Sequence, residues 1–242
     1  MPVVPRVLIL AVFAAALGLG ACATARPAEP PRELVVLVHG MGRSALSMAP
    51  MELALRRAGY RTLNVGYSST GPSVAEIGAD VAEEVRRSLA EEPAPRVHFV
   101  GHSLGTVVIR WVLTHERPER VGRAVLLAPP NRGARSADRM APWVGWSLRP
   151  IWELQTDGGT AVELGTPDAV EIAVVAGDRD RKVAVDETCL DGAEHTVVPS
   201  GHTFIMMRPR VVDVVRGYLA DGELAGAGAA CSASAEEPPA NR

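Results

Sequence analysis

Residues 101–105 read Gly-His-Ser-Leu-Gly, the pattern G-x-S-x-G that is typical of a nucleophile elbow. In such an elbow a strand turns sharply into a helix and exposes a serine hydroxyl at the apex. The flanking segments agree with this, because residues 97–100 are predicted to form a strand and residues 106–113 a helix. Ser103 is therefore the candidate nucleophile for acyl transfer.

A serine nucleophile needs a general base, and the base needs a carboxylate that orients it. His202 follows the last predicted strand and precedes the last predicted helix, which is where the base of such a site is expected. His195 is the alternative, but it begins that last strand and so belongs to the opposite edge of the sheet. His202 is the candidate base, and His195 is predicted to be structural.

The orienting carboxylate is expected after the fifth predicted strand, where Asp178 and Asp180 stand two residues apart. Alternate residues of an extended segment can point the same way, so the spacing leaves both candidates open. Asp186, further along the same loop, is a third candidate. The residue that does not orient the base is expected to be solvated or paired with a neighbouring basic residue.

The oxyanion of a tetrahedral intermediate needs backbone N–H donors. The expected donors are Leu104, directly after the nucleophile, and Met41, in the turn His-Gly-Met-Gly that follows the first predicted strand. His39 and His102 border this turn and the elbow. They are expected to orient or pack the two turns and not to act as bases.

Six short runs of valine and leucine predict strands that are covered on both faces, because the runs are continuous and do not alternate with polar residues. The predicted strands are residues 34–38, 62–65, 97–100, 124–127, 172–175 and 196–198. Helical patterns lie between them, and the clearest begins with the capping box Ser-Val-Ala-Glu at residues 73–76. The alternation predicts an α/β fold with a doubly wound, mostly parallel sheet in one domain, residues 33–220.

The segment 132–170, between the fourth and fifth strands, has no clear period and holds Trp143, Trp146 and Trp152. It is predicted to be an excursion that forms a small lid or the wall of an acyl pocket. The alternative is an ordinary crossover helix that packs these aromatic side chains against the sheet.

The composition excludes several classes of protein. With 242 residues, a net charge of −3 and scattered basic side chains, the chain is not expected to bind nucleic acid. Its three cysteines and its histidines lack the spacing of a zinc site, and neither H-E-x-x-H nor a P-loop is present, so no metal and no cofactor are predicted.

Residues 1–21 combine one arginine with a short apolar run and are predicted to be a signal peptide. The sequence Leu-Gly-Ala-Cys at residues 19–22 resembles the bacterial lipobox, in which Cys22 would carry acyl chains and tether the protein to a membrane. The expected location is the extracytoplasmic face of the cell envelope, with ordinary secretion or a retained membrane anchor as alternatives. Residues 22–32 are predicted to be a Pro-rich spacer, and residues 221–242 a flexible tail.

Lipidation of Cys22 would leave an even pair of cysteines, Cys189 and Cys231, in an oxidising compartment. A disulfide between them is a hypothesis, and two unpaired thiols are the alternative.

Several ordered motifs carry a resemblance to a known family over residues 33–220. Besides His-Gly-Met-Gly and Gly-His-Ser-Leu-Gly, they include Gly-Tyr at residues 59–60, Tyr-Ser-Ser at 67–69, Leu-Ala-Pro-Pro-Asn at 127–131, Val-Ala-Gly-Asp at 175–178 and His-Thr-Phe-Ile-Met at 202–206. Together they resemble the bacterial α/β-hydrolase esterases and lipases that are related to class 2 lipases and PGAP1-like enzymes. The resemblance implies a minimal α/β-hydrolase fold with about six strands.

In these relatives the acid lies in an Asp-Gly-Lys-Val type of stretch, with which Asp-Arg-Lys-Val at residues 180–183 lines up. The resemblance thus ranks Asp180 above Asp178, although Arg181 replaces the glycine. The implied activity is hydrolysis of carboxylic esters, of lipids or other acyl esters, through an acyl-enzyme on Ser103. A thioesterase or an acyltransferase would use the same residues, and a non-catalytic envelope lipoprotein is an alternative of another class. The sequence indicates no particular protein partner.

Overall fold

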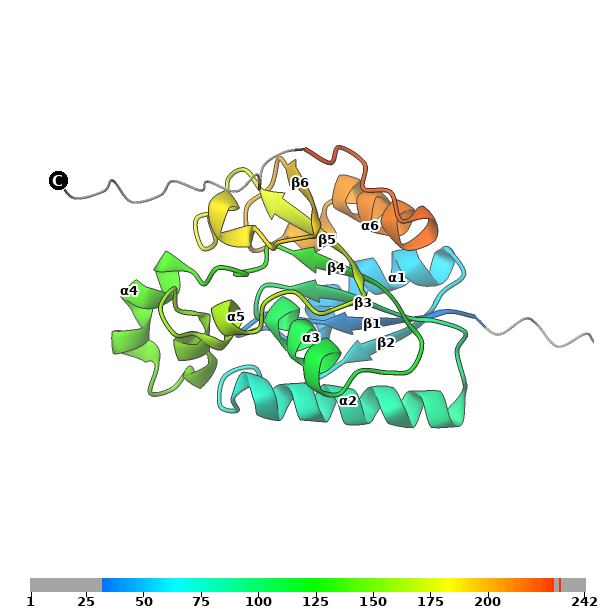
Figure 1. Cartoon of the computed structure of the whole chain (residues 1–242), viewed down its shortest axis with the longest axis horizontal. Coiled ribbons are helices and arrows are strands. Elements are labelled where there is room, and N and C mark those ends of the chain that lie inside the picture. Colours follow the sequence, from blue (N-terminus) through cyan, green and yellow to red (C-terminus); the bar gives the residue numbers. More distant parts are fainter. Residues whose placement is uncertain (1–31, 229–230, 232–242) are drawn as a thin grey trace, which may run out of the picture. The chain divides into compact units, whose positions relative to one another are not determined.

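The computed structural model describes residues 32–228 and Cys231, and within them six strands form one sheet (Figure 1). The strands lie in the order β2-β1-β3-β4-β5-β6, and each neighbouring pair is parallel. Their bounds are β1 Leu34–Val38, β2 Arg61–Val65, β3 Val97–His102, β4 Val121–Leu127, β5 Glu171–Gly177 and β6 Glu194–Val198. The six predicted strands and the doubly wound α/β architecture are confirmed, and the sheet is wholly parallel.

Helices cover both faces of the sheet, with α2 and α3 on one face and α1 and α6 on the other (Figure 1). The α-helices are α1 Ala49–Arg57, α2 Val74–Glu91, α3 Leu104–His115, α4 Arg135–Val144, α5 Thr160–Glu163 and α6 Pro209–Asp221. Short 3-10 turns are η1 Ala45–Met48, η2 Arg149–Leu154, η3 Val185–Thr188 and η4 Ile205–Met207. Alternate residues of β1 contribute to the cores on the two faces, which explains its continuous apolar sequence.

Helix α2 begins where the capping box predicts. The Ser73 hydroxyl accepts a hydrogen bond from the Glu76 backbone N–H at 3.2 Å, and the Ser73 backbone N–H donates to the Glu76 carboxylate at 2.7 Å. These two bonds satisfy N–H groups that have no partner within the helix. Beyond the cap, Ile77, Val81 and Val85 are buried against the sheet, so the spacing of four residues places one apolar face of the helix on the core.

The segment 132–170 lies at the carboxyl edge of the sheet, where α4, η2 and α5 form a unit beside the strand ends (Figure 1). Trp143 and Trp146 are 79% and 87% exposed, so the alternative in which the tryptophans pack a crossover helix against the sheet is wrong for these two. Smaller side chains of the segment, Ala137 and Ala141, are buried in the core instead. The indole ring of Trp143 stays outside because the inward face of α4 is occupied by alanine, and Trp146 follows the end of this helix.

Arg110 of α3 ties this segment to the helix behind the elbow. Its guanidinium donates to the carbonyl oxygens of Ala161 at 2.8 Å and Gly165 at 2.9 Å, and to Oδ1 of Asn131 at 3.2 Å. Burial lowers the pKa of Arg110 to about 10, so the side chain still carries its charge at neutral pH. The charge is stabilised by carbonyl dipoles, and the excursion is thereby fixed to α3.

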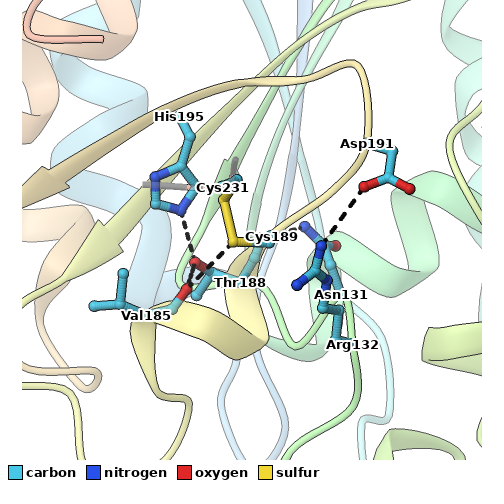
Figure 2. The surroundings of a disulfide bond; sticks show 8 residues. All are labelled: Asn131, Arg132, Val185, Thr188, Cys189, Asp191, His195 and Cys231. Carbon is cyan, nitrogen blue, oxygen red and sulfur yellow. Dashed lines mark hydrogen bonds and ion pairs between the residues drawn. A yellow bond between two sulfur atoms is a disulfide. The ribbon is translucent and has the colours of Figure 1, made fainter. Parts of the chain in front are cut away.

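The chain after α6 packs along β6, the edge strand. Leu224 is buried, Gly228 donates its backbone N–H to the His195 carbonyl at 3.1 Å, and a disulfide joins Cys189 to Cys231 with their Cα atoms 5.5 Å apart (Figure 2). The prediction of a flexible tail over residues 221–242 is therefore wrong for Asp221, which ends α6, for residues 222–228 and for Cys231. The composition of the tail does not show these contacts, because they depend on the edge of the sheet at β6.

Among residues 32–228, no helix has the length and apolar character that a membrane crossing needs. The predicted signal peptide, the lipobox with Cys22 and residues 23–31 of the predicted spacer lie outside the described residues.

Candidate active site

Ser103 stands between β3 and α3 in a conformation that non-glycine residues rarely adopt, with φ 53° and ψ −124°. Its backbone N–H donates to the Leu127 carbonyl of the neighbouring strand β4 at 3.0 Å. This bond holds the strained turn against the sheet, and the hydroxyl projects at the carboxyl edge. The nucleophile elbow that the pattern predicts is thus formed in the structure.

The two glycines of the elbow are needed because other backbone and side-chain atoms occupy the space of a Cβ. A Cβ on Gly105 would lie 2.3 Å from the Val38 carbonyl oxygen, and one on Gly101 would lie 2.7 Å from Cδ1 of Ile109. Both distances are far below van der Waals contact. Gly105 is therefore needed because α3 lies close to β1. Gly101 is needed because α3 packs on β3, the strand that precedes it.

Ser103, His202 and Asp180 form one hydrogen-bonded chain. The Ser103 Oγ lies 2.9 Å from Nε2 of His202, and Nδ1 of His202 lies 2.7 Å from Oδ2 of Asp180. The other carboxylate oxygen, Oδ1, accepts the backbone N–H groups of Lys182 at 2.8 Å and Val183 at 3.0 Å. These bonds aim the carboxylate at the imidazole, so the histidine can present Nε2 to the serine.

The other two acids make different contacts. Asp178 accepts the Ser200 backbone N–H at 3.0 Å and pairs with Arg179, and its side chain is 48% exposed, whereas that of Asp180 is fully buried. Asp186 forms an ion pair with Arg135 at 2.9 Å, which lowers the pKa of its carboxyl. Of the three acids left open by the spacing, the structure therefore brings only Asp180 to the histidine.

Three other histidines, His39, His102 and His195, are buried and hold the structure around them. Nε2 of His102 donates to the backbone carbonyl of His202 at 2.9 Å, and burial holds the pKa of His102 well below its usual value, so this ring is neutral. His39 stacks on Tyr67 with ring centroids 4.1 Å apart. His195 lies beside the disulfide, where its Nε2 contacts the Thr188 hydroxyl at 2.8 Å (Figure 2).

The turn after β1 presents one of the two expected oxyanion donors. Neither the Met41 N–H nor the Leu104 N–H has an acceptor among the described residues. The turn is held by the Tyr67 hydroxyl, which donates to the His39 carbonyl, and by the Ser69 hydroxyl, which accepts the Gly42 N–H at 3.0 Å. Tyr67 and Ser69 appear in the sequence only as part of the motif Tyr-Ser-Ser, and their role depends on the pairing of β2 with β1.

A cavity of about 110 Å³ opens at Ser103 and His202. Its apolar lining consists of Met41, Pro130, Ala134, Ala137, Met140, Ile151, Leu154 and Val183. The segment 132–170 thus lies along the cavity as a wall. Arg43 and Lys182 are the charged residues of this lining that the sequence reasoning did not single out as site residues. The available signals were weak, since Lys182 is the single lysine of the chain and Arg43 directly follows His-Gly-Met-Gly.

Three side chains with metal-ligating atoms lie together away from this cavity. In the part of the chain that the structure describes, the one group of histidine, cysteine and acidic side chains that converges closely is Cys189, His195 and Cys231, with ligand atoms within 4.8 Å. The disulfide engages both sulfur atoms, which would have to be free thiolates to bind a metal ion. This arrangement therefore gives no reason to place a metal there.

The family model for the alpha/beta hydrolase fold matches residues 33–160, which is more than half of the chain. The chain belongs to the α/β-hydrolase family. The "Putative carbamate hydrolase RutD" of Variovorax paradoxus (strain S110) is 37% identical over 100 residues, which make up 39% of this chain and 37% of that protein. This α/β hydrolase thus matches little more than a third of that curated relative's length.

Solved structures of a lipase and an esterase share the fold at low sequence identity. The mature lipase BlEst2 of Bacillus licheniformis superposes with a TM-score of 0.56 at 19% identity, covering 75% of this chain and 88% of that one. The Pyrococcus furiosus esterase Pf2001 gives a TM-score of 0.61 at 18% identity and covers 78% and 83%. At these identities the likeness shows the fold alone.

Proposed function

We propose that this α/β hydrolase cleaves carboxylic esters through an acyl-enzyme on Ser103. The observation that carries the proposal is the continuous hydrogen-bonded chain from Ser103 through His202 to Asp180 at the mouth of an apolar cavity. Proteins named as lipases and esterases share the fold. The sequence motifs, which resemble those of class 2 lipases and PGAP1-like enzymes, favour the same class of reaction.

The acylation step uses the geometry directly. His202 Nε2 takes the proton of the Ser103 hydroxyl as Oγ attacks the ester carbonyl carbon, and the carbonyl oxygen becomes an oxyanion. The N–H groups of Met41 and Leu104 would stabilise that oxyanion. When the tetrahedral intermediate collapses, the bond to the alcohol oxygen breaks and the imidazolium returns its proton to the leaving alcohol. The Asp180 carboxylate holds the ring in position and stabilises its positive charge.

Deacylation repeats the sequence with water. His202 removes a proton from the water as its oxygen attacks the acyl carbonyl, and the collapse of the second intermediate returns a proton to Ser103 Oγ and releases the carboxylic acid. Carbamates and thioesters present a carbonyl carbon of the same kind, so the same residues would act on them. The alternatives differ in the group that leaves and in the acceptor that enters.

The size of the cavity predicts a preference for short acyl groups. A volume of about 110 Å³ is small beside the range of about 300–1,000 Å³ for pockets that hold drug-sized ligands. In a series of 4-nitrophenyl esters, we expect kcat/KM to be highest for acetyl to butyryl groups and to fall by about tenfold or more at decanoyl, because longer chains require the wall 132–170 to move. Release of 4-nitrophenol measures this.

A maximum at decanoyl would contradict the rigid wall and favour a segment that opens like a lid. The same panel should contain a butyryl thioester and a 4-nitrophenyl carbamate, since the relative RutD is named as a carbamate hydrolase. Faster Ser103-dependent cleavage of either compound than of the butyryl ester would reassign the substrate class while retaining the triad.

We further propose that the protein is a lipoprotein of the cell envelope, anchored through Cys22. The apolar run ending in Leu-Gly-Ala-Cys supports this, and the disulfide between Cys189 and Cys231 fits an oxidising compartment. When the full-length chain is expressed in bacteria fed a labelled fatty acid, we expect label on the wild-type protein and none on Cys22→Ser. Equal labelling of both, or labelling of neither, would contradict the anchor.

A further inference from the structure

Two cations face the candidate active site from opposite sides of the nucleophile. Arg43 follows β1 and Lys182 follows β5, and these strands lie on either side of β3, which carries Ser103. Both side chains line the cavity that contains Ser103 and His202. Both also help to lower the pKa of the buried His102, as expected for positive charges close to the elbow.

Neither cation is neutralised by an acid of the described chain. The Arg43 guanidinium donates to the Thr203 carbonyl at 3.4 Å and lies 5.7 Å from the centre of the Phe204 ring, while the Lys182 side chain is exposed. Within residues 32–228 neither forms an ion pair, and the described lining of the cavity includes no carboxylate. In contrast, Arg135 at the start of α4 and Arg179 on the loop after β5 are each paired with an aspartate.

The remaining wall of the cavity determines where an anion could sit. Ala137, Met140, Ile151 and Leu154 form an apolar side that suits an acyl chain and would not solvate a charge. A negatively charged group would therefore lie toward the open side of the cavity, where Lys182 is exposed. When the acyl part of an ester lies against the apolar wall, its alcohol part must lie on this open side. Unpaired arginine and lysine side chains favour phosphate and carboxylate groups.

We propose that the site hydrolyses short-chain acyl esters whose alcohol carries an anionic group, phosphate or carboxylate, which Arg43 and Lys182 bind. The inference rests on the ester hydrolysis proposed above and names its substrate class. The two cations bind and orient the alcohol part, and the bond-breaking steps remain those of Ser103 and His202.

Three esters with the same acyl group test this inference: 1-butyrylglycerol, which is neutral, 1-butyrylglycerol 3-phosphate, and 3-O-butyrylglycerate, which carries a carboxylate. We expect kcat/KM for at least one anionic ester to exceed that for 1-butyrylglycerol by about tenfold or more. Comparison of the two anionic esters shows whether phosphate or carboxylate fits better. Equal values for all three esters would overturn the inference.

Variants show whether the two named side chains cause the preference. Arg43→Gln and Lys182→Gln are each expected to lower the ratio of anionic to neutral kcat/KM by about three- to tenfold. Arg181→Gln is the matched control, because Arg181 is an exposed cation next to Lys182 that does not line the cavity, and it should leave the ratio unchanged. An equal loss in Arg181→Gln, or no loss in the other two, would overturn the assignment.

A binding measurement separates failure of this inference from failure of the ester hydrolase proposal. The Ser103→Ala protein is titrated calorimetrically with 1-butyrylglycerol 3-phosphate and with 1-butyrylglycerol. We expect the phosphate ester to bind more tightly, with the difference lost when Arg43→Gln is added. If 1-butyrylglycerol is hydrolysed through Ser103 without any preference, the ester hydrolase proposal stands and the anion site falls. If no ester is hydrolysed but the phosphate ester still binds more tightly, the anion site stands and the ester hydrolase proposal falls. Equal binding of the two esters overturns the anion site.

Discussion

Replacing Ser103 by alanine is expected to lower kcat for 4-nitrophenyl butyrate by about 10³-fold or more, because the acyl-enzyme cannot form without the Oγ nucleophile. The residual rate would come from the oxyanion donors and from substrate binding, which the substitution leaves in place. The side chain is small and its Oγ bonds to His202, so the melting temperature should change little. Steady-state release of 4-nitrophenol and thermal unfolding measure the two quantities.

Ser68→Ala is the matched control for this prediction. Ser68 is an exposed serine on the loop after β2 that contacts neither His202 nor the cavity, and its replacement should leave kcat within about twofold of the wild type. If Ser103→Ala retained wild-type turnover in a folded protein, the reaction would use another nucleophile.

Asp180→Asn is expected to lower kcat by about 10²–10⁴-fold. An amide removes the negative charge beside His202 and can offer its NH2 group to Nδ1, which would favour the ring tautomer that carries its proton on Nε2. That tautomer cannot accept the proton of the Ser103 hydroxyl. The backbone N–H groups of Lys182 and Val183 donate to the Asp180 carboxylate, and the amide oxygen of asparagine can still accept these bonds. The variant should therefore fold.

Asp178→Asn, two residues earlier, makes the same chemical change at an exposed acid. Asp178 binds the Ser200 N–H and Arg179, and the change should alter kcat by no more than about threefold. A severe loss in Asp178→Asn together with wild-type turnover in Asp180→Asn would overturn the assignment of the acid. The pair is informative because both variants are isosteric and share one loop.

Much of the architecture follows from local sequence. Continuous apolar runs are diagnostic of strands covered on both faces, and the six predicted strands are present because each run is short and bounded by turn or helix signals. The elbow could likewise be predicted, since Gly105 must approach the carbonyl of Val38 and only glycine fits there. These features can be predicted because strands and helices alternate regularly along the chain.

The choice among the acids was open because it depends on a turn. Asp180 faces His202 because one of its oxygens accepts the N–H groups of Lys182 and Val183, which closes the loop around the carboxylate. The spacing of Asp178 and Asp180 does not specify that turn. The resemblance to the esterases ranked Asp180 first, and the hydrogen bonds give the physical reason.

Features that depend on distant packing were predicted least well. Leu224 is buried because β6 leaves an open sheet edge for the chain after α6, whereas the disulfide between Cys189 and Cys231 agrees with the hypothesis drawn from the number of cysteines. Trp143 is exposed because α4 turns its alanines to the core, and Trp146 follows the end of that helix. The two cations Arg43 and Lys182 are 139 positions apart in the sequence, and the order of the strands brings both of them to the cavity.

The most direct test of the account is the labelling of the folded protein with a fluorophosphonate, followed by mass-spectrometric mapping of the modified peptide. The reagent reacts with a serine whose hydroxyl is activated by a neighbouring base, and it does not require knowledge of the natural substrate. We predict one adduct on Ser103, which is absent in Ser103→Ala and strongly reduced in His202→Ala. A folded wild-type protein that remains unmodified, or an adduct on a different serine, would contradict the central claim that Ser103 is an activated nucleophile.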